Sequence, residues 1–208
     1  MLHFKTVEPL TLSILEQLME MPELSNFSLV GGAALSLLYG HRMSDDLDFF
    51  SNKPFENTDI ITALTNKFKE KFITEEKQPR FGIFCFIEDV KVDIVRHSHP
   101  LIRQELDEDG IRMFSKEDII AMKVQAILGR GRKKDFWDIA ELLDHFSVAD
   151  FIQFHKDKYS TQNLLITVPQ AITFFSDAEE SEAPVSLKKQ TWKSVQQLIS
   201  KKVSTYLK

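Results

Sequence analysis

The spacing of apolar residues in the first half of the chain alternates between helical and strand-like periods. Leu12, Leu15 and Leu18 recur at three-residue intervals and predict a helix over residues 8–20. Shorter apolar runs predict strands, and a second amphipathic stripe predicts a further helix. The elements expected after residue 20 are strands at 27–30, 47–50, 81–88 and 91–95 and helices at 33–39 and 59–72. This half of the chain therefore reads as α/β.

From residue 115 onward the apolar spacing is helical. Ser115 followed by Asp118 is a capping-box pattern in front of an apolar run. Helical stretches are predicted at 119–128, 135–145, 148–155, 163–175 and 187–206, and the acidic segment 177–184 is expected to be a loop. We predict an α+β protein with a mixed sheet and helices in residues 1–114 and a helical bundle in residues 115–208.

Composition narrows the class of protein. Of the 208 residues, 43% are hydrophobic and 17 are Phe, which is enough for a packed core. No apolar run approaches the roughly 20 residues needed to cross a membrane, so no membrane partner is expected. Cys85 is the only cysteine, which excludes an intrachain disulfide and fits a reducing, cytoplasmic location. The net charge of -5 leaves only local basic patches, at 130–134 and 188–208, for nucleic acid.

The strongest chemical signal is a pair of aspartates one residue apart. A strand alternates its faces, so Asp46 and Asp48 are expected to point the same way. Asp93 interrupts another apolar strand and is costly to bury without a partner. Three converging carboxylates would suit magnesium, which prefers oxygen ligands. The alternative is that these acids are solvated residues at strand edges.

Three further features could bind phosphate. Gly31 and Gly32 lie between a predicted strand and helix, where exposed amides favour phosphate, although an ordinary tight turn would look the same. Lys123 lies on an apolar helix face, either to contact a phosphate or to pair with an acid. The basic loop before Asp135 and Asp138 could hold phosphate or be solvated, and both acids suit a helix start.

Together these residues resemble a known family. Residues 40–49 read Gly-His-Arg-Met-Ser-Asp-Asp-Leu-Asp-Phe after a Gly-Gly turn and a short helix. Lys123 follows on a later helix, and residues 130–138 then read Arg-Gly-Arg-Lys-Lys-Asp-Phe-Trp-Asp. This order resembles the AbiEii/AbiGii nucleotidyltransferase-like toxins of the DNA polymerase β-type superfamily. The similarity extends from about residue 27 to residue 143. Gly32 and Ala33 depart from the pattern, because relatives often carry hydroxyl side chains there.

The resemblance implies roles for individual residues. The implied metal ligands are Asp46, Asp48 and Asp93, and Asp93 could instead act as a base on the acceptor hydroxyl. The implied nucleotide-binding residues are Gly31, Gly32, Arg42, Ser44 and Lys123. Asp135 would be a further active-site residue.

The resemblance also implies an activity. It predicts a magnesium-dependent enzyme that transfers a nucleoside monophosphate from a nucleoside triphosphate to an acceptor such as tRNA, with pyrophosphate leaving. Such a protein would be the toxin of a toxin–antitoxin or phage-defence system, with a cognate antitoxin as partner. Two alternatives stay open: an enzyme that modifies a small, aminoglycoside-like molecule, and a non-catalytic regulatory module that retains the fold.

Overall fold

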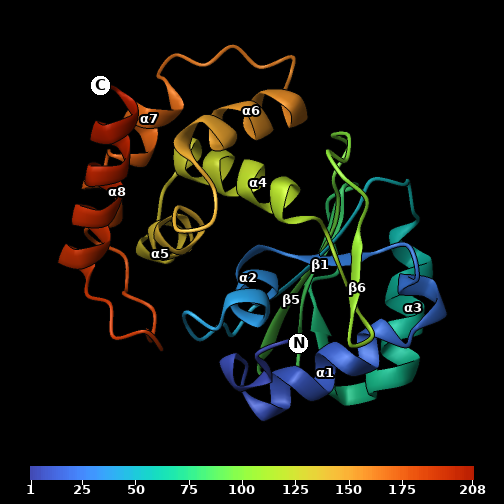
Figure 1. Ribbon diagram of the computed structural model, residues 1–208. Helices are drawn as coiled ribbons and strands as arrows, with labels where there is room; N and C mark the ends of the chain where they lie inside the picture. The colour runs from blue at the N-terminus through green and yellow to red at the C-terminus, as the bar shows by residue number, and fades with distance from the viewer.

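The computed structural model describes residues 1–208 and contains one seven-stranded mixed sheet (Figure 1). The strand order is β3-β4-β5-β2-β1-β7-β6. The strands are β1 (Ser28–Val30), β2 (Leu47–Ser51), β3 (Phe72–Thr74), β4 (Gly82–Ile87), β5 (Val90–Arg96), β6 (Leu106–Glu108) and β7 (Ile111–Met113). β2 and β5 run parallel at the centre, and β4 and β1 flank them antiparallel.

Eight α-helices complete the fold, and they fall into two groups. They are α1 (Pro9–Met19), α2 (Gly31–Tyr39), α3 (Asn57–Phe68), α4 (Lys116–Gly129), α5 (Lys133–Leu142), α6 (Val148–Lys158), α7 (Val168–Ile172) and α8 (Trp192–Tyr206), with short 3-10 turns at Phe4–Thr6, Pro22–Leu24, Lys69–Lys71 and Ser176–Ala178. In Figure 1, α4 to α8 gather beside one end of the sheet, and α1 and α3 lie toward the other end. None of the helices is long and apolar enough to span a membrane.

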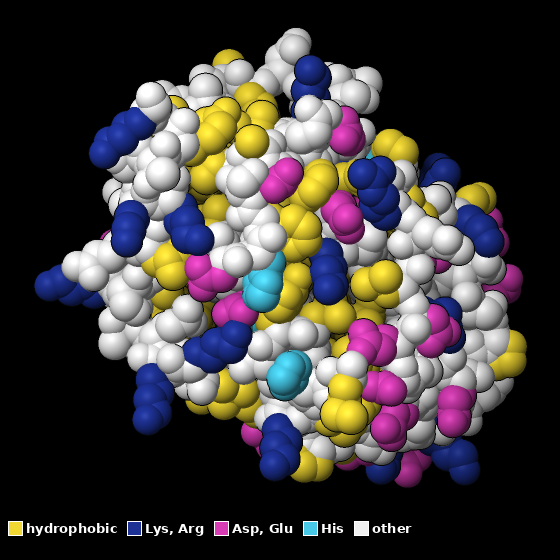
Figure 2. Space-filling model, in the orientation of Figure 1, with side chains coloured by type: hydrophobic (Ala, Val, Ile, Leu, Met, Phe, Trp, Pro, Cys, Tyr) yellow, Lys and Arg dark blue, Asp and Glu magenta, His cyan; other side chains and the backbone are white.

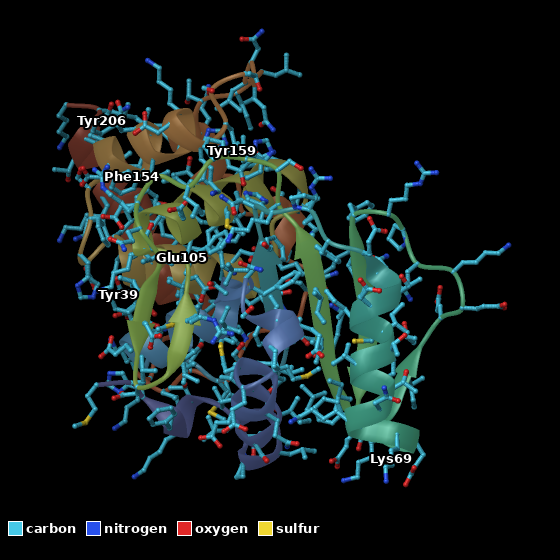
Figure 3. All side chains as sticks on the ribbon, turned by 90° about the vertical axis from the view of Figure 1, so that its right-hand side faces the viewer. Tyr39, Lys69, Glu105, Phe154, Tyr159 and Tyr206 are labelled. Carbon is cyan, nitrogen blue, oxygen red and sulfur yellow. The ribbon has the colours of Figure 1, made fainter.

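The two faces of the sheet differ in polarity. Leu47 and Phe49 of β2 are buried, and Asp48 between them points to the other face, which is only partly covered. Figure 3 shows Tyr159, directly after α6, near the upper end of the sheet, and Lys69 at the lower end of α3. The polar face of the sheet opens toward α4, and this opening contains the site described below.

The predicted α+β class is confirmed, and most predicted elements are found within a few residues of their expected bounds. Three strands, β3, β6 and β7, were not predicted, because three residues are too few to show an alternating pattern. β1 is equally short, but its apolar residues before the Gly-Gly turn predicted it. The helix predicted over 163–175 is wrong: only Val168–Ile172 is helical, and it begins where Thr167 caps it with Pro169 in its first turn.

A single hydrophobic core of 48 buried residues runs through both halves of the chain. At the boundary, a fully buried ion pair joins α6 to the start of α4: Lys158 Nζ lies 2.6 Å from Asp118 Oδ1. Asp118 also accepts hydrogen bonds from the backbone N–H groups of Ile102 and Arg103, in the segment that leaves the sheet. The division into parts at residue 114 stays a prediction, but the bonds of Asp118 to Ile102 and Arg103 join the helical part to the first part.

Replacing Lys158 with Met should destabilise the fold. The change leaves the Asp118 carboxylate buried without its cation, so the free energy of unfolding should fall by about 3–5 kcal/mol in urea denaturation. The matched control is Lys156→Met, which changes an exposed lysine on the same helix and should have little effect. Equal stability of Lys158→Met and the control would contradict a structural role for the pair.

Candidate active site

Two of the predicted metal ligands lie side by side on the polar face of the sheet. Asp48 of β2 is in register with Asp93 of β5, and in neighbouring strands such residues point to the same face. Asp46 lies just before β2 and lines the same cleft, which has a volume of about 830 Å³. α4 and α5 form its other wall, with Lys123 and Asp135 among its lining residues. The structure thus brings together all five residues predicted as catalytic.

The charges of the three acids are balanced unevenly. Lys134 Nζ lies 2.9 Å from Asp46 Oδ2, and although burial opposes it, this lysine lowers the pKa of Asp46. Asp48 accepts no hydrogen bond; burial, and then the neighbouring charge of Asp93, raise its pKa. Lys91 contacts one oxygen of Asp93, and the other oxygen is buried without a partner. Of the three acids, Asp48 is therefore the one that pairs with no lysine.

This donor set fits a divalent cation in its chemistry. Paired carboxylate oxygens, one of them without a hydrogen-bond partner, are the ligands that magnesium prefers. No three carboxylate, imidazole or thiol groups are already arranged as a metal-binding cluster. Lys91 and Lys134 instead contact the outer acids, Asp93 and Asp46. Asp48 and Asp93 are therefore the pair that best fits a cation in this side-chain arrangement.

Both glycines of the Gly-Gly turn are required by close approach. The helix α2 begins at Gly31, two residues earlier than predicted, and Gly31 has a φ of +69°. A Cβ atom on Gly31 would lie 2.5 Å from Asp48 Oδ2, and one on Gly32 would lie 2.3 Å from a guanidinium nitrogen of Arg42. Ser44 Oγ lies beside Gly32 as well. Because neither glycine has a side chain, the Asp48 carboxylate and the Arg42 guanidinium can lie directly against the start of α2.

A fully buried carboxylate, Asp138 of α5, joins the sequence motif at 40–49 to the helical half. Arg42 binds it with two nitrogens, Nε to Oδ1 at 2.7 Å and a terminal nitrogen to Oδ2 at 2.9 Å. His41 Nε2 lies 2.7 Å from Oδ1, and Lys123 Nζ lies 2.7 Å from Oδ2. Burial alone would raise the pKa of Asp138, but Arg42 and Lys123 hold it well below its usual value.

Lys123 and Asp135 also form a pair. Lys123 Nζ lies 3.0 Å from Asp135 Oδ1, while the other oxygen of Asp135 accepts a hydrogen bond from the backbone N–H of Arg132. Asp138 and Asp135 hold the pKa of Lys123 above its ordinary value against the effect of burial. Lys123 therefore pairs with acids, as one of the two expectations held, and it also lines the cleft, while its contact with a phosphate stays a prediction.

Sequence reasoning missed the contribution of three residues to this site. Asp138 was assigned only to a helix start, His41 had no role, and Lys134 was expected only to bind phosphate. The three-residue spacing of Asp135 and Asp138 carried the missing signal, because it places both carboxylates on one helix face. The pairing of Lys134 with Asp46 had no local signal, since 88 residues separate them.

A nucleotidyltransferase fold with converging acids is the class that this geometry defines, and comparison with known proteins agrees. Residues 13–203 match the family described as "Nucleotidyl transferase AbiEii toxin, Type IV TA system". The chain belongs to the AbiEii family and is a nucleotidyltransferase. The resemblance seen in the sequence is therefore confirmed.

Individual relatives extend this picture. An uncharacterised protein of Aquifex aeolicus is 30% identical over 199 residues, which cover 93% of this chain and 94% of the relative. A crystal structure of a candidate nucleotidyltransferase from Helicobacter pylori is similar with a TM-score of 0.59 and 19% identity, over 97% of this chain and 93% of that one. The nucleotidyltransferase toxin MenT4 of Mycobacterium tuberculosis gives 0.51 and 12%, over 90% and 82%. At these low identities, the property that the two solved structures share with this chain is the fold.

Replacing Asp138 with Asn should destabilise the protein in a pH-dependent way. The folded-state pKa of Asp138 is depressed, so its contribution is fully present above the unfolded pKa of about 3.9 and is lost as pH falls toward the folded value. Urea denaturation at neutral pH should show a loss of about 3–5 kcal/mol, and this difference should shrink below about pH 4.

The control for this prediction is Asp144→Asn, which removes a half-exposed carboxylate that pairs with Lys202. It should cost less than about 1 kcal/mol. A difference between wild type and Asp138→Asn that is equal at neutral and acidic pH would refute the assignment of the buried ion pair.

Proposed function

We propose that this protein transfers a nucleoside monophosphate from a nucleoside triphosphate to a hydroxyl group of an acceptor, in a magnesium-dependent reaction. The acceptor oxygen forms a bond to the α-phosphorus, the bond from that phosphorus to the bridging oxygen of the β-phosphate breaks, and pyrophosphate leaves with the electron pair. The observation that carries the proposal is the register of Asp48 with Asp93 beside the Gly-Gly turn.

The residues predicted as catalytic or nucleotide-binding each have a role in this proposed reaction. Asp46, Asp48 and Asp93 would hold magnesium, which when bound stabilises charge on the attacking and leaving oxygens. Asp93, whose free oxygen lacks a partner, is also placed to accept the proton of the acceptor hydroxyl. The unpaired N–H groups at the start of α2 and the hydroxyl of Ser44 orient the triphosphate.

The cations divide into positioning and binding groups. Arg42 is tied to Asp138, and through it holds the segment before β2 in place beside Gly32. Lys123 lines the cleft and would add positive charge near the phosphates. Asp135 orients Lys123 through the ion pair between them. Water is excluded from this inner part because His41, Arg42 and Asp138 are buried.

For the acceptor and the biological role, we propose tRNA and a toxin paired with a cognate antitoxin. The family description as a toxin of a type IV toxin–antitoxin system supports the role, with defence against phage as one setting. Arg130 and Arg132 are exposed at the cleft rim and support an RNA acceptor. In Figure 2, by contrast, acidic side chains gather over the α/β half of the visible face.

Asp48→Asn should abolish transfer without unfolding the protein. Incubation with magnesium, each α-labelled triphosphate and total tRNA should label RNA with wild type, and the rate should fall at least about 100-fold in the variant, because charge neutralisation at the α-phosphate is worth several kcal/mol. Asp46→Ala should lose activity in the same assay. The control Asp107→Asn, an exposed acid of β6, should label RNA like wild type. Equal labelling by Asp48→Asn and wild type would refute the proposed site.

Arg130→Ala/Arg132→Ala should weaken RNA binding in a salt-dependent manner. Each lost phosphate contact should reduce the slope of log affinity against log salt by about one, and the KM for tRNA should rise while the affinity for triphosphate changes less. The control pair Lys5→Ala/Lys67→Ala removes the same charge from exposed positions outside the cleft. If both pairs shift the slope equally, the rim arginines do not form the RNA-binding surface.

A further inference from the structure

A second feature of the polar sheet face lies beyond the carboxylates. Phe84 and Phe86 of β4 and Ile73 of β3 point to this face, and they are 38%, 48% and 61% exposed. Strand alternation places them there, because Ile83, Cys85 and Ile87 fill the buried face of β4. Ile73 and Phe86 are direct partners across the two strands. The result is an apolar strip that no helix covers.

This strip is the floor of a groove with a volume of about 500 Å³, which adjoins the catalytic cleft. Phe84, Lys91 and Asp93 line both the groove and the cleft, so the two spaces share a wall. The volume lies within the range of small-molecule sites, and a mostly apolar floor with a few polar groups is typical of them. Lys77 and Gln78 form part of the outer wall.

The register places the groove on a defined side of the reaction. Val30, Asp48, Asp93 and Phe84 are successive partners across β1, β2, β5 and β4. Gly31 follows Val30, so one end of this row is the phosphate-binding turn and the other end is Phe84. The attacking and leaving oxygens of a phosphoryl transfer lie roughly in line. If pyrophosphate leaves at the glycine end, the acceptor enters from the side of Phe84.

We propose that the groove over Phe84 and Phe86 binds the terminal nucleoside of a single-stranded polynucleotide acceptor, whose base stacks on Phe84. This inference rests on the proposed function and specifies its acceptor side. Adjacent strands are about 4.8 Å apart, so a base on Phe84 brings its sugar hydroxyl toward Asp93. Aromatic side chains bind bases of any sequence by stacking.

The charges of the groove favour a polynucleotide over a cationic small molecule. Lys77 lines it and can contact a phosphate of the strand, whereas an aminoglycoside-like acceptor needs a mostly acidic, polar wall. Glu75 and Asp93 are the acids of the lining, and Lys91 already pairs with Asp93.

The test compares donor and acceptor binding in Phe84→Ala. Fluorescence anisotropy with a short, labelled single-stranded RNA carrying a free 3′ hydroxyl should show affinity about 5- to 100-fold weaker than wild type. The KM for total tRNA should rise in parallel. Binding of fluorescent nucleoside triphosphates with magnesium should be unchanged. Phe84→Trp should restore RNA affinity, because it restores an aromatic face.

Phe174→Ala is the matched control, since Phe174 is 54% exposed after α7 and lines neither the groove nor the cleft. It should bind RNA like wild type. A matching DNA oligonucleotide tests whether the sugar contributes. Unchanged RNA affinity and KM in Phe84→Ala, with transfer by wild type intact, would overturn the inference and leave the proposed function standing.

Two other outcomes are distinguishable. If wild type transfers no label to any acceptor and binds no triphosphate, the proposed function fails, whatever Phe84 does to RNA binding. Sedimentation measures the remaining possibility, that a second copy covers the strip: a wild-type dimer that becomes monomeric in Phe84→Ala would overturn the acceptor assignment.

Discussion

The carboxylate of Asp138 is fully buried, and its charge would be costly there without the cations that surround it. Arg42 binds it with two nitrogens, Lys123 reaches it from α4, and His41 completes the shell. These partners come from the segment before β2 and from α4, and Asp138 itself lies on α5. Because Asp138 on α5 binds groups from these two other segments, the position of the helical half over the sheet depends on this cluster.

The same cluster separates structural charge from reactive charge. Burial would raise the pKa of Asp138, but Arg42 and Lys123 hold it low. On the polar face of the sheet, Asp48 has no hydrogen-bond partner, and its pKa is raised by burial and by the charge of Asp93. A site that binds a cation and a triphosphate needs such a region of unbalanced negative charge. The structure therefore concentrates its satisfied ion pairs in the wall of the cleft and leaves its unsatisfied oxygens on the sheet.

Local sequence patterns were enough to predict part of this arrangement. Strand alternation predicted that Asp46 and Asp48 point the same way, Asp93 was expected as a third acid from another strand, and the family motif named Arg42, Ser44 and Lys123. The ion pairs between distant segments could not be predicted. Lys134 and Asp46 are 88 residues apart in the sequence, and Lys158 and Asp118 are 40 residues apart. Very short strands such as β6 and β7 carry no period. The helix expected over 163–175 failed because apolar residues there, Leu164 to Ile166, are exposed in a loop.

The row across the sheet also explains why the sequence pointed to the donor more clearly than to the acceptor. Triphosphate chemistry constrains residue types tightly: glycines that admit a carboxylate and a guanidinium, acids in register, and a lysine nearby. Stacking of a base requires only an aromatic surface, and the sequence alone does not single out Phe84 among 17 phenylalanines. Its exposure and its register with Asp93 distinguish it, and both are properties of the folded sheet. Acceptor recognition in such a protein is therefore encoded by topology more than by motif.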